Sequence, residues 1–252
     1  MKHLIVGNWK MHLGPHEADL LVKRLEQHIE ADPSTEVVVC PPFIDLHSVH
    51  RGIDHKKLKV GAQNAHHLDE GAYTGEVSAA MLKGLAEYVI IGHSERRAMG
   101  ETDELIAKKM TAAVRNGLTP ILCVGESLTE RHHKLSIKVV TDQLEAGLSL
   151  LTDEDVAKVV IAYEPIWAIG SGVPATPEQI KPAIKAIRTT VEELYGESAS
   201  SGVRILYGAS VKSDFVNSIL SIDNVVGLLV GGASLNYAEF AKIVKSVQQF
   251  GA

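Results

Sequence analysis

Eight short apolar runs recur along this chain of 252 residues, and they limit its possible folds more than any other feature. Each run carries Val, Ile and Leu on successive residues rather than on alternating ones. This pattern is typical of strands in a parallel sheet that is covered on both faces. The runs begin near residues 4, 36, 58, 88, 120, 158, 203 and 225, and segments of helical period lie between them, among them 16–30, 103–117, 177–196 and 235–250.

Eight βα units in a chain of this length favour a single closed eight-stranded parallel β/α barrel. No change of composition and no Pro- or Ser-rich linker divides the sequence, so we expect residues 1–252 to form one catalytic domain. An open doubly wound sheet is the alternative. It would need a G-x-G-x-x-G turn after the first strand, where Asn8, Trp9 and Lys10 stand instead.

Charge and cysteine content restrict the partners and the compartment. A formal net charge of −6 offers no basic face for a phosphate backbone, so we expect no nucleic-acid partner. Cys40 and Cys123 lie at the ends of strand-like runs, which suggests buried, reduced thiols. The apolar run at the N-terminus is too short for a signal peptide, and VVGLLVGG falls short of the ~20 residues of a membrane span. We therefore expect a cytoplasmic protein without a membrane partner.

Polar and small residues close most of the apolar runs, and in a barrel they meet at one mouth. Taken alone, each residue can be explained without a functional site, for example as a solvated cation in a loop or as a carboxylate at the start of a helix. Charged groups gathered on an apolar rim carry desolvation costs, which stability alone would not favour. The residues are Asn8, Lys10, Gln63, Asn64, His93, Glu95, Glu126, Glu164, Ser210, Gly231 and Gly232.

The last two strands are followed by loops suited to an anion. YGASV and VGGASL contain small residues whose backbone N–H groups can approach a phosphate, and SLNYAEF opens a helix at its positive end. Barrels frequently bind phosphate between these two loops. The alternative is that Gly231 and Gly232 only form a tight turn.

The histidine pairs do not favour a metal site. His66-His67 and His132-His133 lack the i, i+4 spacing of a zinc-binding helix, so we interpret them as loop histidines and expect no metal. His93 differs, because HSERR places it at a helix start, where N–H groups can hydrogen-bond a ring nitrogen and disfavour the imidazolium.

The motifs NWKM, AQN, GAYTGEVS, IGHSERR, CVGE, AYEPIWAIG, ATPEQ, YGASV and VGGASL occur together and in this order. With them the sequence resembles the triosephosphate isomerase family over essentially its whole length. The resemblance implies interconversion of dihydroxyacetone phosphate and D-glyceraldehyde 3-phosphate through an enediolate, in glycolysis and gluconeogenesis. It also implies that the enzyme needs neither a cofactor nor a metal.

The resemblance assigns roles to matched positions. Glu164 of AYEP would be the base, and His93 of IGHSE would be the neutral imidazole that polarises the carbonyl and moves protons between the two oxygens. Asn8 and Lys10 of NWK would stabilise the enediolate, with Glu95 close to Lys10.

The phosphate would be held by backbone N–H groups of the lid and of the last two loops. An apolar cap would keep the base dry. The expected phosphate-binding residues are Gly170, Ser210, Gly231 and Gly232, and the expected cap consists of Ile169 and Leu229.

Two further expectations follow from the resemblance. By this resemblance, residues 164–172 would form a hinged lid. The segment begins at Glu164, continues through Pro165 and Trp167 and ends with the glycines at 170 and 172. The loop Gly71–Ser78 would reach into a second copy of the chain, where Thr74 would support Asn8 and His93 of the partner subunit. We therefore expect at least a homodimer, and a tetramer stays open.

Three departures from the family pattern concern loops rather than the expected catalytic side chains. They are Gly208-Ala209 in place of Gly-Gly, Val173-Pro174-Ala175 at the end of the lid, and a stretch between Arg97 and Gly100 that holds only Ala98 and Met99. We expect them to affect loop dynamics and interface packing. One hypothesis is that Pro174 and Ala209 slow the lid until its motion limits turnover.

Two competing functions deserve a test. A Schiff-base aldolase would use Lys10 as its nucleophile. A non-catalytic barrel that senses a phosphorylated metabolite would keep the phosphate loops but would not need both Glu164 and His93.

Overall fold

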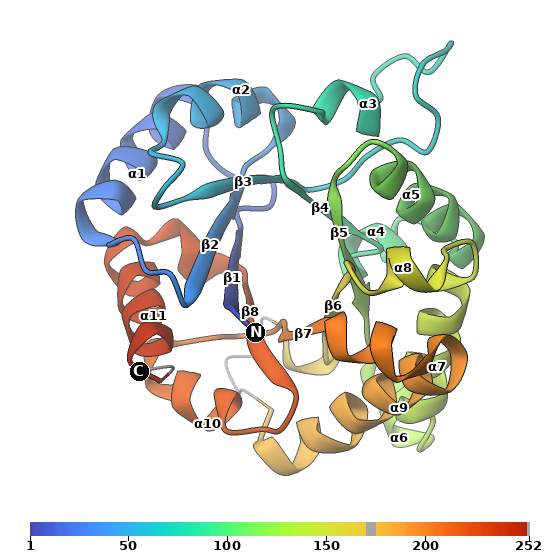
Figure 1. Cartoon of the computed structure of the whole chain (residues 1–252). Helices are drawn as coiled ribbons and strands as arrows, with labels where there is room; N and C mark the ends of the chain where they lie inside the picture. The colour runs from blue at the N-terminus through green and yellow to red at the C-terminus, as the bar shows by residue number, and fades with distance from the viewer. Residues whose placement is uncertain (170–174, 251–252) are drawn as a thin grey trace.

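Eight parallel strands pair in sequence order, and β1 closes the ring against β8 (Figure 1). This computed structural model describes residues 1–169 and 175–250. The predicted closed β/α barrel is confirmed, and each apolar run forms one of its strands. The strands are β1 His3–Asn8, β2 Thr35–Cys40, β3 Lys59–Ala62, β4 Tyr88–Ile91, β5 Thr119–Val124, β6 Val160–Tyr163, β7 Arg204–Tyr207 and β8 Val225–Val230.

Helices surround the barrel, and their apolar faces pack against the strands (Figure 1). In the part of the chain that the structure describes, no helix has the length and apolar character needed to cross a membrane. The helices are α1 Pro15–His28, α2 Phe43–Gly52, α3 Ala79–Leu82, α4 Ser94–Ala98, α5 Asp103–Arg115, α6 Leu128–His132, α7 Ser136–Leu148, α8 Asp153–Val156, α9 Pro177–Gly202, α10 Val216–Leu220 and α11 Tyr237–Phe250. Three 3-10 turns accompany them: η1 Ile166–Ala168, η2 Ser213–Phe215 and η3 Gly232–Leu235.

The strands have two buried faces, which explains why they are apolar at consecutive positions. In β1, Leu4 and Val6 point into the barrel, whereas Ile5 packs against the helices outside it. Cys40 and Cys123 lie inside the barrel as free, fully buried thiols, as predicted. The interior cluster consists of Leu4, Val6, Val38, Cys40, Tyr88, Ile90, Ile121, Cys123, Val160, Ala162, Leu206 and Leu229.

The alternation of strand and helix is irregular after β3. A long loop leaves the body of the molecule there, and only the four-residue α3 precedes β4 (Figure 1). Gly71 and Gly75 adopt φ of 143° and 93° within this loop, which L-residues rarely reach. Its sequence has no helical period, so the loop is built as an arm rather than as a covering helix.

Candidate active site

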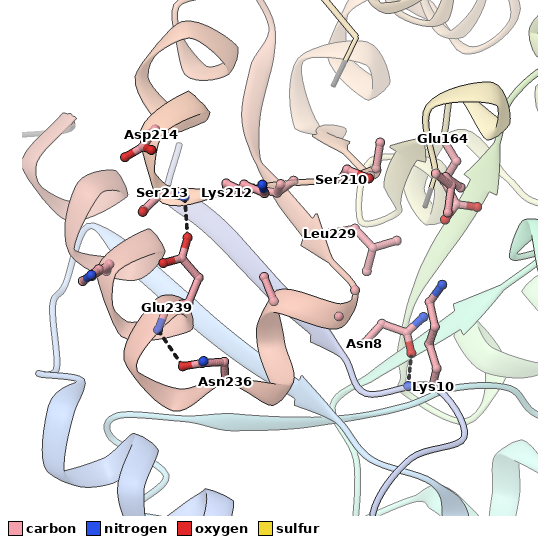
Figure 2. A pocket seen from close by; sticks show the side chains of 18 of the residues that line it. Asn8, Lys10, Glu164, Ser210, Lys212, Ser213, Asp214, Leu229, Asn236 and Glu239 are labelled. Carbon is pink, nitrogen blue, oxygen red and sulfur yellow. Dashed lines mark hydrogen bonds between the residues drawn. The ribbon is translucent and has the colours of Figure 1, made fainter. Parts of the chain in front are cut away.

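A pocket of about 780 Å³ opens at the C-terminal ends of the strands (Figure 2). It is lined by residues that follow β1, β4, β6, β7 and β8, so the closure of the barrel gathers side chains that are far apart in sequence. Predicted residues in its lining are Asn8, Lys10, His93, Glu164, Ile169, Ser210, Leu229, Gly231 and Gly232.

Glu164 and His93 form a buried pair at the floor of this pocket. His93 Nε2 lies 3.0 Å from Glu164 Oε1, and the side chains are only 7% and 4% exposed. The Ser94 N–H donates to the other carboxylate oxygen, Oε2, at 3.1 Å. Both oxygens of Glu164 therefore have a donor, which fixes the plane of the carboxylate.

The protonation of His93 follows from the contacts of its two ring nitrogens. His93 is the N-cap of α4, and its Nδ1 accepts the Glu95 N–H at 3.2 Å, as the sequence predicted for a helix start. Burial lowers the pKa of His93, but the Glu164 and Glu95 carboxylates together outweigh burial and raise it. A doubly protonated ring would nevertheless carry a proton on Nδ1, and this N–H would face the N–H of Glu95, so that two donors would repel each other. We therefore assign the neutral ring, with its proton on Nε2 facing Glu164.

Glu164 is held in its ionised form despite its burial. Burial alone raises the pKa of a carboxyl group, but His93, the Ser94 N–H and Lys10 outweigh it and lower the pKa of Glu164. Gly208 leaves room for this side chain, because a Cβ at that position would lie 3.2 Å from Glu164 Cγ. The site thus presents a charged, dry base at neutral pH.

Lys10 has an unusual backbone conformation that directs its side chain into the pocket. Its φ is 55°, and its N–H donates to Asn8 Oδ1 at 3.0 Å (Figure 2). The Gln63 amide donates to the Lys10 carbonyl at 2.8 Å and braces the turn. Lys10 Nζ pairs with Glu95 Oε1 at 2.6 Å. Strained backbone held by its surroundings is typical of functional sites.

Small residues line the side of the pocket formed after β7 and β8. Ser210 Oγ donates to the Ala168 carbonyl at 3.1 Å and so joins this loop to the segment after Glu164. At Gly231, a Cβ would lie 3.4 Å from Lys10 Cε, so a glycine lets the lysine pass close to the backbone. Gly232 begins η3.

The sequence expectation for the start of α11 differs from the structure. Asn236 Oδ1 accepts the N–H groups of Ala238 and Glu239, each at 3.1 Å (Figure 2). These N–H groups are already capped and do not face the pocket as free anion donors. The short turn η3, rather than α11, brings small residues to the opening.

Apolar side chains border the base. Leu229 is 3% exposed and lines the pocket beside Glu164 (Figure 2). Ile169, which follows η1, lines the same pocket. The predicted positions Gly170, Gly172, Val173 and Pro174 lie outside the described residues. The hypothesis that lid motion limits turnover therefore stays a prediction.

Three strand-end residues predicted at the mouth serve other contacts. Gln63 braces the Lys10 turn from outside the pocket lining. Asn64 Oδ1 accepts a hydrogen bond from the buried Lys109 ammonium at 2.8 Å. Glu126 is fully buried and accepts the Trp167 indole N–H at 2.8 Å. Residue type and strand position could not separate these structural roles from roles at the pocket.

The histidine pairs have contacts of their own. The His66 ring lies 4.5 Å from that of His67 and 4.4 Å from that of Tyr73, and its Nδ1 accepts the Leu68 N–H. His133 Nδ1 is within hydrogen-bond distance of the Thr129 carbonyl. These rings organise a loop and a helix end.

Sequence reasoning missed two contacts that shape the site. The backbone N–H of Ser94 holds Glu164, and a signal for it was available, since the residue after a helix N-cap has a free N–H. The brace from Gln63 to Lys10 had no comparable signal, because it spans residues 53 positions apart.

Comparisons with known proteins give consistent matches over nearly the whole chain. The family model described as triosephosphate isomerase matches residues 3–247. Proteins named triosephosphate isomerase from Thermoanaerobacter pseudethanolicus and Caldanaerobacter subterraneus subsp. tengcongensis are 48% and 49% identical over 243 residues, covering 96% of this chain and 98% of each relative. One from Clostridium beijerinckii is 46% identical over 245 residues, with the same coverage.

Proposed function

The chain belongs to the triosephosphate isomerase family, and we propose that the pocket at its strand ends is where it interconverts dihydroxyacetone phosphate and D-glyceraldehyde 3-phosphate. The observation that carries this proposal is the buried pair of Glu164 and His93, 3.0 Å apart. A reaction that moves one proton between neighbouring carbons needs a base at carbon and a proton donor at oxygen within one small site.

Glu164 acts as the base in this proposal. Its carboxylate takes a proton from C1 of dihydroxyacetone phosphate, the electron pair of the broken C–H bond forms a C1–C2 double bond, and the carbonyl oxygen becomes negatively charged. The same group then returns the proton to C2 to give the aldehyde. The ionised state of Glu164 supports this role, because only the carboxylate form can accept a proton from carbon.

His93 and Lys10 act on the oxygens. The neutral His93 ring donates from Nε2 to the carbonyl oxygen and moves a proton between O1 and O2 of the enediolate. Lys10 and Asn8 supply a positive charge and an amide beside the developing charge, where preorganised groups are most effective. Glu95 pairs with the ammonium of Lys10 and orients it.

We propose that the substrate phosphate binds against Ser210, Gly231 and Gly232, which line the same pocket. The proximity of Gly231 to Lys10 supports this arrangement, since a dianion there would meet both backbone N–H groups and an ammonium. Gly170 belongs to the proposed set on the resemblance alone. Ile169 and Leu229 would cover the reacting carbons.

The contacts of Lys10 argue against a Schiff-base aldolase. The nitrogen of an aldolase lysine must reach the carbonyl carbon of its substrate, whereas Lys10 Nζ is held in an ion pair with Glu95 Oε1 at 2.6 Å. A sensor without activity would have no need for the buried Glu164–His93 pair. A coupled assay of D-glyceraldehyde 3-phosphate isomerisation tests the proposal, and lack of turnover by folded protein would reject it. Borohydride trapping of substrate on Lys10 would instead favour the aldolase.

We further propose that residues 1–252 act as one catalytic domain, that the chain forms at least a homodimer, and that it works in the cytoplasm, where glycolysis takes place. Exposed apolar side chains support the dimer. Met11, Ile44 and Met99 are 94%, 74% and 72% exposed, and Tyr73 stands on the projecting arm (Figure 1). Thr74 on the arm would support His93 of the partner subunit.

A further inference from the structure

The distance between Glu164 and His93 depends on three neighbouring strands. His93 follows β4, Glu164 follows β6, and β5 lies between them in the barrel. The Glu164 N–H donates to the Val124 carbonyl at 2.8 Å, which ties the end of β6 to β5. A corresponding tie between the turn that carries His93 and β5 would fix the pair from both sides.

Arg97 makes that tie. It belongs to α4, the five-residue helix that His93 caps, and its side chain is 15% exposed. Its Nε donates to the carbonyl of Gly92 at 2.8 Å, and its Nη2 donates to the carbonyl of Cys123 in β5 at 3.3 Å. One guanidinium therefore connects the residue before His93 with the residue before Val124.

The guanidinium is held in place by its surroundings. Asp103, the first residue of α5, accepts from Arg97 Nη1 at 2.5 Å. Gly92 has a φ of 70°, and a Cβ there would lie 3.3 Å from Arg97 Nη2 and 3.0 Å from Ile106 Cδ1. The short stretch between Arg97 and Gly100 lets the chain turn back at Gly100, with φ of 94°, toward Asp103.

We propose that Arg97 is a positioning residue for the isomerisation: it holds the His93 turn against β5 and so sets the contact between His93 and Glu164. It acts through Gly92 and Cys123 and makes no contact with the reacting atoms. A planar fork with several donors suits three acceptors in fixed directions, and a lysine ammonium cannot reproduce it. The inference rests on the proposed function of the pocket.

The expected kinetic effect falls on turnover. A displacement of a catalytic group by about 1 Å can reduce a rate on the order of 100-fold. We expect Arg97→Ala to lower kcat by about 10-fold to 100-fold and to change KM by less than about 3-fold, because the proposed phosphate ligands follow β7 and β8. Guanidinium ion at a low, non-denaturing concentration should restore part of kcat in Arg97→Ala, and Arg97→Lys should stay impaired.

Lys138→Ala is the control for loss of an ion pair. Lys138 pairs with Asp142 on α7, and the two side chains are 69% and 56% exposed. This variant should keep the parent kcat and KM. Circular dichroism and the thermal midpoint of each variant show how much protein is folded.

The pH profile separates positioning from loss of structure. The fall of kcat/KM in acid combines protonation of Glu164 in the free enzyme with protonation of the substrate phosphate, which is the same for parent and variant. A loosened His93 contact should move the Glu164 contribution, and with it the fall, to higher pH than in the parent. Partial unfolding would lower kcat at every pH and leave the profile in place. Lys10, Glu95 and Cys123 are other titratable groups beside the pair. The variant removes the Arg97 charge that acts on Cys123, but burial raises the pKa of this thiol far above the acid range in which the profile is compared.

Three outcomes overturn the inference while the parent enzyme isomerises its substrate: a kcat close to that of the parent, a loss of kcat that matches the loss of folded protein, or an unshifted acid limb. If Arg97→Ala does not fold, the same measurements on Arg97→Lys and Asp103→Asn test the inference. Both variants keep a positive charge at position 97 but weaken the hydrogen bonds that hold the side chain in place. An inactive parent enzyme would reject the proposed function of the pocket itself.

Discussion

The basicity of Glu164 is set by the groups that donate hydrogen bonds to it. His93 and the Ser94 N–H lower its pKa against the effect of burial, so Glu164 stays ionised throughout the pH range in which the substrate phosphate is a dianion. Removing the donor in His93→Ala should raise the pKa of Glu164 and move the fall of kcat/KM to higher pH. A pH profile with the same acid limb in both proteins would contradict this account of the pair.

Asp45 is a buried carboxylate that costs stability. It is fully buried, neither oxygen has a hydrogen-bond partner among the described residues, and burial and Asp19 raise its pKa. The folded state therefore holds its proton to higher pH than the unfolded chain. The loss of folding stability due to Asp45 is therefore absent below the pKa of the unfolded chain, about 3.9, and complete above the pKa of Asp45 in the folded protein.

We predict that Asp45→Asn stabilises the protein by about 1 kcal/mol at neutral pH, the lower range for an unsatisfied buried group. The gain in the thermal midpoint should shrink in acid, where Asp45 is protonated. Denaturation curves at several pH values measure both effects. A variant less stable than the parent at neutral pH would show that the carboxylate has a favourable partner in solution.

The element that follows β6 links the base to a buried anchor. Trp167 in η1 donates to Glu126, and the Arg131 guanidinium lies 4.2 Å above its ring and donates to the same carboxylate at 3.1 Å. Glu164 is three residues before Trp167, so the anchor sets where this segment leaves the strand.

Trp167→Phe should therefore lower kcat/KM by about 10-fold, because it frees the segment that carries Ile169. The control is Tyr163→Phe, which removes another donor to Glu126, at 3.1 Å, without touching this segment. We expect the control to lose stability with a smaller kinetic effect. Equal kinetic losses in the two variants would contradict a role for the anchor.

Elements were predictable where a local pattern defines them, and less so where tertiary contacts do. Each strand was visible in its apolar run, because two buried faces leave no polar positions. α9 runs past the predicted end at Gly196, whose φ of 82° breaks its regularity before the chain turns helical again. The sequence shows that Asn236 is a residue type suited to cap α11. It does not show that this cap takes up N–H groups that could otherwise bind an anion.

The molecule as a whole exposes the apolar side chains of Met11, Ile44, Tyr73 and Met99, and we predict that a second copy of the chain covers them. Multi-angle light scattering should give at least twice the mass of 27.2 kDa. Thr74→Arg should weaken the assembly, because a charged side chain would enter the proposed interface, and activity should fall with it. A monomer with full activity would contradict the prediction.

The barrel was predictable as a whole because eight successive strand-and-crossover units admit few closed arrangements. The pocket was predictable in part: Asn8, Lys10, His93 and Glu164 each lie at the end of a strand or within two residues after it, and closure brings them together. The roles of Asn64 and Glu126 were not, because they depend on Lys109 and Trp167 and thus on helix packing. The resemblance to a family supplied the reaction, which strand ends alone do not specify.

The steady-state kinetics of Glu164→Asp decide most directly whether this carboxylate is the base. The shorter side chain keeps the charge and withdraws it by about one methylene, roughly 1 Å or more, so kcat should fall about 100-fold while KM changes little. The assay is the coupled isomerisation of D-glyceraldehyde 3-phosphate, with parent and variant compared at equal folded concentration. A raised KM with an unchanged kcat would instead assign Glu164 to substrate binding and contradict its role in proton transfer.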